Sequence, residues 1–111
     1  MISNPRNGFI VQNGNMANTI VSSPVDLTGS GGCAVQATWS GVSGTGTLYL
    51  QASAYPDQSQ YAQVSSSAFT VSSVSGNDMW NVTSSKYIWA QLVWAPSGSC
   101  VGTLTAVVNK K

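Results

Sequence analysis

The stretch CAVQATWSGVSGTGTLYLQAS, residues 33–53, decides the fold. From Cys33 to Trp39 every second residue is apolar, and the residues between are mostly polar. A period of two with one apolar face is typical of a half-buried β-strand. The alternation stops at residues 41–46, which hold three glycines, and it returns at Thr47. Glycine tolerates the positive φ angles of tight connections, so the stretch predicts a β-hairpin whose turn is at 41–46.

A similar pattern recurs near the C-terminus. Residues 34–39 align with residues 89–94, with glutamine three positions before tryptophan in both, and Gly-Thr-Leu follows at 46–48 and 102–104. The turns differ by one residue, so we interpret the pair as a quasi-repeat; two unrelated hairpins with similar turns are the alternative. Each tryptophan is predicted to close a strand end, with its ring over the core edge and its N–H near water.

The remaining residues predict further short strands. After an extended arm at 1–7, a strand at 8–12 ends at Asn13-Gly14, the strongest short hairpin signal, and residues 18–22 are its expected partner. Pro24 breaks that run, and residues 25–27 fit an edge strand, where a missing donor is tolerated. A turn is predicted at 75–78, and additional strands are predicted at 61–65, 68–74, 87–94 (a central strand, apolar on both sides) and 101–108.

No segment has a convincing helical period. About eight short strands separated by glycine-rich turns predict an all-β fold, an antiparallel β-sandwich or jelly roll, with a closed barrel as the alternative. A length of 111 residues fits a single domain spanning 1–111.

Charged residues make up only 6% of the chain, against roughly 25% in an average soluble domain. So little charge gives weak repulsion between free copies, which suggests that much of the surface faces a partner. The net charge of +1 argues against a nucleic-acid partner, and no apolar run is long enough for a membrane span. The polar start of the chain lacks the apolar core of a signal peptide, so we expect synthesis in the cytoplasm.

Titratable chemistry is scarce. The chain has no histidine, and its only side-chain carboxylates are Asp26, Asp57 and Asp78, of which the last two lie in turn sequences that aspartate usually caps. We therefore predict a protein that is not an enzyme, with no catalytic residue, no metal and no cofactor. Cys33 and Cys100 are expected to be free thiols; a disulfide between them would instead favour a secreted structural or adhesive domain.

Four tryptophans and four tyrosines could build a sugar-stacking platform, although packing in the core and at its rim is the favoured interpretation. Tyr49 is the best candidate for exposure because it lies on the polar side of its predicted strand.

The sequence WSGVSGTGTLYLQAS at 39–53 resembles a pattern in small structural proteins of tailed bacteriophages. In these, a Gly/Thr/Pro turn leads into a Gly-Thr-Leu-x-Leu-Gln strand. YIWAQLVW at 87–94, followed by GTLT at 102–105, is similar to a later part of that pattern. The likeness covers about 33–53 and 86–109. The chain departs from it at Tyr55-Pro56-Asp57, where the family has an asparagine-aspartate-glycine stretch.

The resemblance implies a β-sandwich virion protein of the head decoration or cement type, made in the host cytoplasm and located on the virion. Its partners would be the major capsid protein or other virion proteins, and it would be a homo-oligomer, with a trimer favoured. The alternative is a receptor- or carbohydrate-binding module of a tail or fibre. Termini are free to order on a partner, so the candidate contact residues are mostly terminal. They are Met1, Ile2, Asn4, Arg6, Tyr49, Trp80, Lys110 and Lys111.

Overall fold

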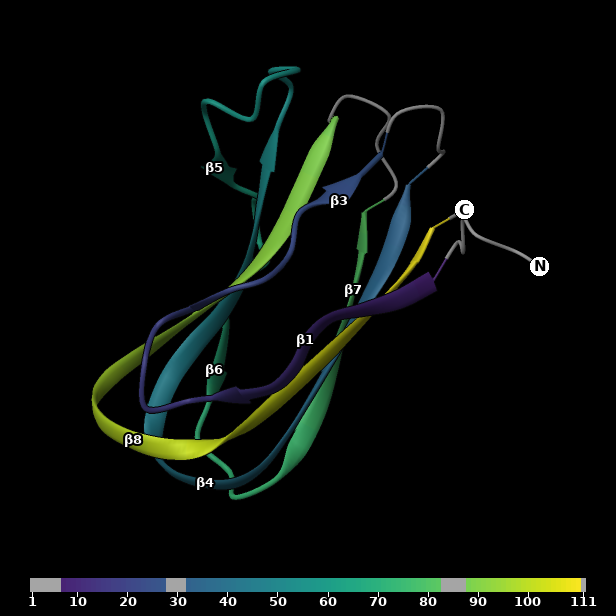
Figure 1. The fold of residues 1–111 in the computed structure, drawn as a ribbon. Coiled ribbons are helices and arrows are strands. Elements are labelled where there is room, and N and C mark those ends of the chain that lie inside the picture. Colours follow the sequence, from purple (N-terminus) through teal and green to yellow (C-terminus); the bar gives the residue numbers. More distant parts are fainter. Residues whose placement is uncertain (1–6, 28–31, 83–87, 111) are drawn as a thin grey trace.

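A computed structural model describes residues 7–27, 32–82 and 88–110, and the regular structure in these ranges is β-strand (Figure 1). All eight strands belong to one antiparallel sheet, with β8 and β4 side by side at its centre. The predicted all-β class with about eight strands is confirmed. The strands are β1 (Asn7–Asn15), β2 (Ile20–Val21), β3 (Val25–Asp26), β4 (Cys33–Ser53), β5 (Ala62–Gln63), β6 (Phe69–Val71), β7 (Gly76–Val82) and β8 (Trp89–Lys110).

Strands β4 and β8 contain 21 and 22 residues and pair along their whole length. Cys33 lies opposite Lys110 at one end, and Ser53 lies opposite Trp89 at the other. The pairing shifts register between Ser40 and Thr45, where both strands turn sharply together (Figure 1). The prediction of two separate hairpins is therefore wrong: each stretch is one bent strand, and the two stretches pair with each other.

The glycines of the bend allow a sharp change of direction, but they do not decide between a hairpin and a bent strand. Gly41 and Gly44 have φ angles of 64° and 95°, which suit a β-bulge as well as a tight turn. A Cβ atom on Gly44 would lie 2.6 Å from the Ser99 carbonyl oxygen, so β8 passes too close for any side chain. Because β8 continues the hydrogen bonding on both sides of the interruption, the glycines bend β4 instead of ending it.

The bend folds the sheet over, and its two halves enclose a common core (Figure 1). The first layer consists of β1, the C-terminal half of β8, the N-terminal half of β4, and β7. The second layer consists of β2 and β3, the other halves of β8 and β4, and β5 and β6. This arrangement is compatible with the predicted sandwich, with layers that are continuous through the bends. Fully buried residues from both layers meet in the core: Val35, Ala37, Leu48, Leu50, Leu92, Trp94, Leu104 and Ala106.

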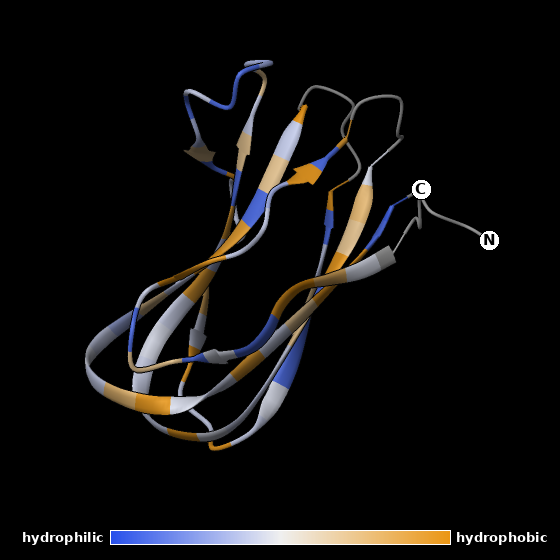
Figure 2. Ribbon diagram, in the orientation of Figure 1, coloured by the Kyte–Doolittle hydropathy of each residue, from blue (hydrophilic) through white to orange (hydrophobic). Residues whose placement is uncertain are grey.

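The two copies of the quasi-repeat face each other across the central ribbon. Trp39 lies opposite Leu104, and Trp94 lies opposite Leu48, so each tryptophan is paired with the leucine of the other copy. The pairing gives the ribbon a local two-fold relation. Along both strands, hydropathy varies residue by residue, as a sheet with one core face requires (Figure 2).

The indole N–H groups differ from expectation. Trp94 is fully buried, and its Nε1 donates to the Met16 carbonyl oxygen at 2.9 Å, so the prediction of an N–H near water is wrong for this residue. Trp39 is 3% exposed, and its Nε1 donates to Ser73 Oγ at 3.4 Å. Both rings are core residues, because burial of an indole is tolerated when its N–H finds an acceptor.

Two predicted turns are also wrong. β1 continues through Asn13-Gly14 and pairs with β8; β2 likewise pairs with β8 and not with β1. Asn13 has a φ of 54° beside a register shift, so the dipeptide forms an irregularity within the strand. The turn predicted at 75–78 is mostly strand, since β7 begins at Gly76, where the Trp39 ring covers the glycine.

The other strands differ less from their predicted ranges. Asn7, assigned to the arm, belongs to β1, and the rest of the arm lies outside the described residues. β3 is an edge strand after Pro24, as predicted, and β8 is central. The strands expected at 61–65 and 68–74 are shorter than predicted, as β5 and β6.

Candidate protein-contact face

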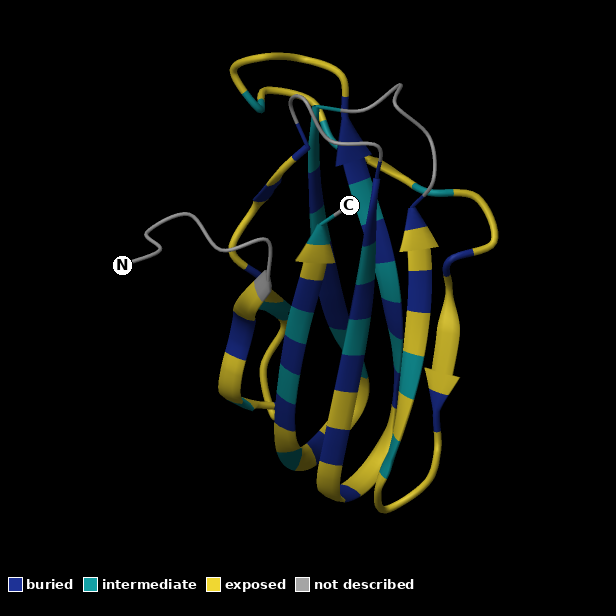
Figure 3. Cartoon of the chain, turned by 90° about the vertical axis from the view of Figure 1, so that its right-hand side faces the viewer, coloured by how far each residue is buried: buried dark blue, intermediate teal, exposed yellow. Residues whose placement is uncertain are grey.

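A row of residues on the outer surface crosses the four strands of the first layer, β1, β8, β4 and β7. Figure 3 shows how buried and more exposed positions alternate along these strands. Phe9 lies opposite Val107, which lies opposite Gln36, which lies opposite Met79. These residues alternate with buried neighbours such as Val35, so they point away from the core. Phe9 is 60% exposed and Met79 is 53% exposed. We call these four residues the cross-sheet row.

Uncharged side chains, all polar except Ala34, flank the cross-sheet row. On the side near the chain ends, the next row holds Asn109, Ala34 and Asn81. The row on the bend side consists of Thr105, Thr38 and Asn77. None of these side chains carries a charge, so this part of the surface can be covered without removing an ion from water.

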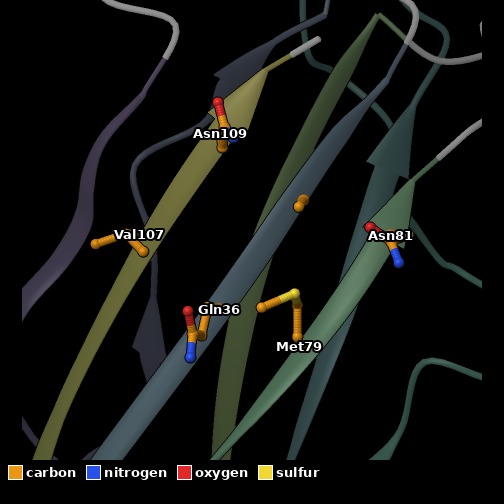
Figure 4. Close-up of a pocket in the computed structure, with 6 residues that line it drawn as sticks. Gln36, Met79, Asn81, Val107 and Asn109 are labelled. Carbon is orange, nitrogen blue, oxygen red and sulfur yellow. The ribbon is translucent and has the colours of Figure 1, made fainter.

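Two shallow hollows lie on this face. One, of about 310 Å³, is shown in Figure 4, where the Met79 side chain reaches from β7 toward β4 and Gln36. The other, of about 340 Å³, lies beside Phe9. Both are lined by Val107 and Asn109, so they are neighbouring parts of one uneven surface across the sheet. An uneven surface with shallow hollows fits the protruding side chains of another protein better than a fully enclosed small molecule.

The structure does not gather the predicted contact residues in one place. Tyr49 is half-buried on the outer surface of the second layer, opposite Val93. Trp80 is only 8% exposed, and its Nε1 donates to the Ser67 carbonyl oxygen at 2.7 Å. The predicted partner contact at Trp80 is therefore corrected: it is a core side chain, because its strand position faces inward.

Of the terminal candidates the structure describes Lys110, at the end of β8 in the first layer. Lys110 Nζ donates to the Asp26 carbonyl oxygen at 3.3 Å. Asn7 lies opposite Asn109, so the start of β1 and the end of β8 are neighbours at the edge of the face. The predicted contacts at Met1, Ile2, Asn4, Arg6 and Lys111 lie outside the described residues.

Sequence reasoning missed the cross-sheet row. Met79 is close in sequence to the apolar residues Trp80 and Val82, but the strand directs Met79 outward and the other two inward. Strand parity was the available signal for Met79. Its neighbours Val107 and Phe9 come from strands far away in the sequence, so only the register brings them together.

The titratable groups are spread over the molecule. Asp57 Oδ1 accepts a hydrogen bond from the Ser59 amide at 3.0 Å, as expected for a turn cap, and hydrogen bonds from Ser59 lower the pKa of Asp57. Asp78 Oδ1 accepts from the Met79 amide at 2.9 Å. Within the described ranges, no three or more histidine, cysteine, aspartate or glutamate side chains are grouped so that they could hold a metal ion.

Both cysteines are buried and free, which agrees with the prediction of free thiols. Burial raises the pKa of the Cys33 thiol, and the positive charge of Lys110 opposes part of that rise. A buried thiol with a raised pKa is a poor nucleophile, so Cys33 acts as a small apolar residue.

The outer surface of the second layer is more polar. Gln91 Nε2 donates to Gln51 Oε1 at 2.8 Å, and Gln63 lies on the other side of Gln51. Tyr49 is two positions from Gln51 and so shares this surface.

No protein-family model matches this chain, and a search of curated proteins finds no significant relative. The described residues contain no helix with the length and hydropathy that a membrane crossing needs.

Proposed function

We propose that this chain is a virion structural protein of tailed bacteriophages, a head decoration or cement protein that binds the shell through protein–protein contacts. The observation that carries the proposal is the uncharged face around the cross-sheet row, with Phe9 and Met79 more than half exposed. The sparse charge of the whole chain and its resemblance to small phage structural proteins support it. The role is passive and not enzymatic.

The size of the face limits how tightly one copy can bind. Four strands about 4.8 Å apart, each about seven residues long at about 3.4 Å per residue, cover about 450 Å². A standard stable interface buries about 800 Å² on each partner. Stable attachment therefore needs further contacts, from other segments of the chain or from neighbouring copies in an oligomer such as a trimer.

The mechanism depends on selective binding. A protein that binds the assembled shell, and not its separated subunits, shifts the equilibrium toward the assembled state by mass action. The major capsid protein is the proposed partner, because a decoration protein that spans junctions between its subunits would hold them together. The gain in particle stability would increase with occupancy.

A deletion strain tests the proposal. Particles without this protein are expected to lose their DNA at lower temperature and lower salt than parental particles, and added purified protein should restore resistance. Phe9→Ser should fail to restore it because it removes the largest exposed apolar group of the face. Val74→Ser, at a 67% exposed residue outside the face, is the matched control. Deletion particles as resistant as the parent would refute a cement role.

The second layer favours one alternative, a carbohydrate-binding module of a tail or fibre. Tyr49 and the bonded pair Gln51 and Gln91 place a ring beside amide groups, which is the chemistry that sugar sites use. This function predicts glycan binding that Tyr49→Ala abolishes. A flat glycan-array response would eliminate it without affecting the cement proposal.

A further inference from the structure

Strand β7 is a long and regular open edge of the first layer. It pairs with β4 from Cys33 opposite Val82 to Trp39 opposite Gly76 without a register shift, and no described residue pairs with its other side. The opposite edge, β1, is different. It has two register shifts, and its Ile10 carbonyl oxygen accepts a hydrogen bond from the Ser23 amide at 3.0 Å. Irregular edges resist strand addition, whereas regular ones invite it.

The hydrogen-bond pattern identifies which backbone groups of β7 point outward. The Met16 amide donates to the Gly102 carbonyl oxygen at 3.0 Å. The backbone N–H and C=O of Gly102 therefore point toward the β1 side of β8. The direction of the backbone N–H and C=O groups alternates from residue to residue along a strand. The N–H and C=O of Val107 therefore point toward β4, and those of its partner Gln36 point toward β8.

At Val35, the residue before Gln36, the backbone N–H and C=O point the other way, toward β7. The N–H and C=O of its partner Trp80 point back toward β4. Met79, next in β7, consequently presents its N–H and C=O outward, as do Asn77 and Asn81. The bond from the Met79 amide to Asp78 Oδ1 agrees with this assignment, because that amide bonds to a side chain of its own strand.

The outward residues of β7 are self-complementary. Asn77, Met79 and Asn81 read the same in both directions, so an antiparallel copy centred on Met79 places methionine against methionine and asparagine against asparagine. The same register puts Asp78 opposite Trp80, so no two aspartates face each other. A contact in which each copy uses the same residues is the property of a two-fold interface.

We propose that two copies of this chain associate by antiparallel pairing of their β7 strands about a two-fold axis at Met79. The pairing joins two four-stranded layers into one eight-stranded sheet and extends the cross-sheet row across both copies. Main-chain hydrogen bonds would supply the affinity, as in other cases of strand addition. The inference does not depend on which shell or ligand the protein binds.

The pair is expected to be weak. A seven-residue edge buries much less than a standard interface, and Asp78 competes for the Met79 amide. Dimerisation should therefore appear at high protein concentration, or where copies are held side by side on a surface.

A charge-exchange experiment at Met79 tests the two-fold directly. Sedimentation equilibrium over a concentration series should show a monomer–dimer equilibrium for the wild type. Met79→Lys and Met79→Glu, each alone, should weaken dimerisation at least about tenfold, because like charges then face each other across the axis. An equimolar mixture of the two should regain the dimer. The matched control is the same pair of substitutions at Val101, 54% exposed and outside β7, which should change nothing.

A backbone variant gives an independent test. Asn81→Pro removes an outward N–H that β4 does not use, so the fold should be retained by circular dichroism while the dimer is lost. The proposal is overturned if the wild type stays monomeric throughout the series or forms a trimer without a dimer. It is also overturned if the mixed Met79 variants do not recover association, or if Asn81→Pro folds and still dimerises.

Discussion

The packing of Trp94 against Gly46 makes a sharp prediction about the fold. Gly46 is buried in β4 just after the bend, and the Trp94 ring lies directly over it. A Cβ atom there would meet Trp94 Cζ2 at 2.8 Å and the Ala95 carbonyl oxygen at 2.7 Å. Neither neighbour can move away easily, because Ala95 contributes backbone and Trp94 is fully buried, with its Nε1 bonded to Met16.

Gly46→Ala is therefore expected to lower the free energy of unfolding by about 3 kcal/mol, the upper range for overpacking a core. Proteins of this size are stable by roughly 5–15 kcal/mol, so the variant should still fold. With a urea m-value of about 2 kcal/mol/M, the midpoint of unfolding should fall by about 1.5 M.

Two other glycines separate steric cost from conformational cost. An added Cβ meets nothing within 4 Å at Gly41 or Gly8, but Gly41 has a φ of 64°. Gly41→Ala should cost about 1–2 kcal/mol, from the left-handed conformation alone. Gly8→Ala should be neutral or stabilise by about 0.5 kcal/mol, because it restricts the unfolded chain.

Tryptophan fluorescence during urea unfolding measures all three variants, since Trp39, Trp80 and Trp94 are buried in the native state. The expected order of destabilisation is Gly46→Ala, then Gly41→Ala, then Gly8→Ala. A Gly46→Ala midpoint within about 0.25 M of the wild type, equivalent to about 0.5 kcal/mol, would refute the proposed close approach of the ring. A larger loss at Gly41 than at Gly46 would mean that the bend conformation, not core packing, sets the cost.

Three further predictions concern buried groups. Ser67 Oγ accepts a hydrogen bond from the Leu50 amide at 3.1 Å and donates to the Val64 carbonyl oxygen at 2.7 Å. Ser67→Ala should therefore lower the free energy of unfolding in urea by about 2 kcal/mol. Ser72→Ala, at an exposed position, should leave it almost unchanged. The pKa of Cys33 is raised above its usual 9.0, so the unfolded chain loses the thiol proton at a lower pH than the folded protein does. The free energy of unfolding should therefore stay level below pH 9.0 and fall as the pH rises through the higher folded pKa. Cys33→Ala should flatten this decline, and an unchanged decline would contradict the prediction. A thiol reagent should modify neither cysteine of the native protein within minutes and both in urea, and rapid labelling of native protein would show that burial does not protect them.

The strand content was predictable because local pattern carries it. Alternation around Val35 and around Leu48 marks two segments with one buried face each, and both are buried on the predicted side. The turn cap at Asp57 also follows from local sequence, whereas the prediction of a free Cys33 thiol rests on the polar start of the chain.

Connectivity was not predictable, because a glycine-rich interruption fits a reversal and a bend equally well. At residues 41–46 the choice is made by β8, about fifty residues later in the chain, which pairs with β4 on both sides of the interruption. Asn13-Gly14 is the same case: local sequence favours a hairpin, yet pairing with β8 keeps β1 extended. The face of Phe9 and Met79 depends on the same long-range register, so it could not be derived before the fold.

The central position of β8 has a consequence for biosynthesis. Both layers are assembled around β8, which follows the other described strands in the sequence, so neither can form while those 22 residues are still being added. At about 5–20 residues per second, that interval lasts about 1–4 s. During it the edge of β4 that pairs with β8 has no partner, and core residues of β4 such as Leu50 lack the β8 side chains that help to bury them. Premature termination even a few codons into β8 should therefore leave an unfolded polypeptide, not a smaller domain.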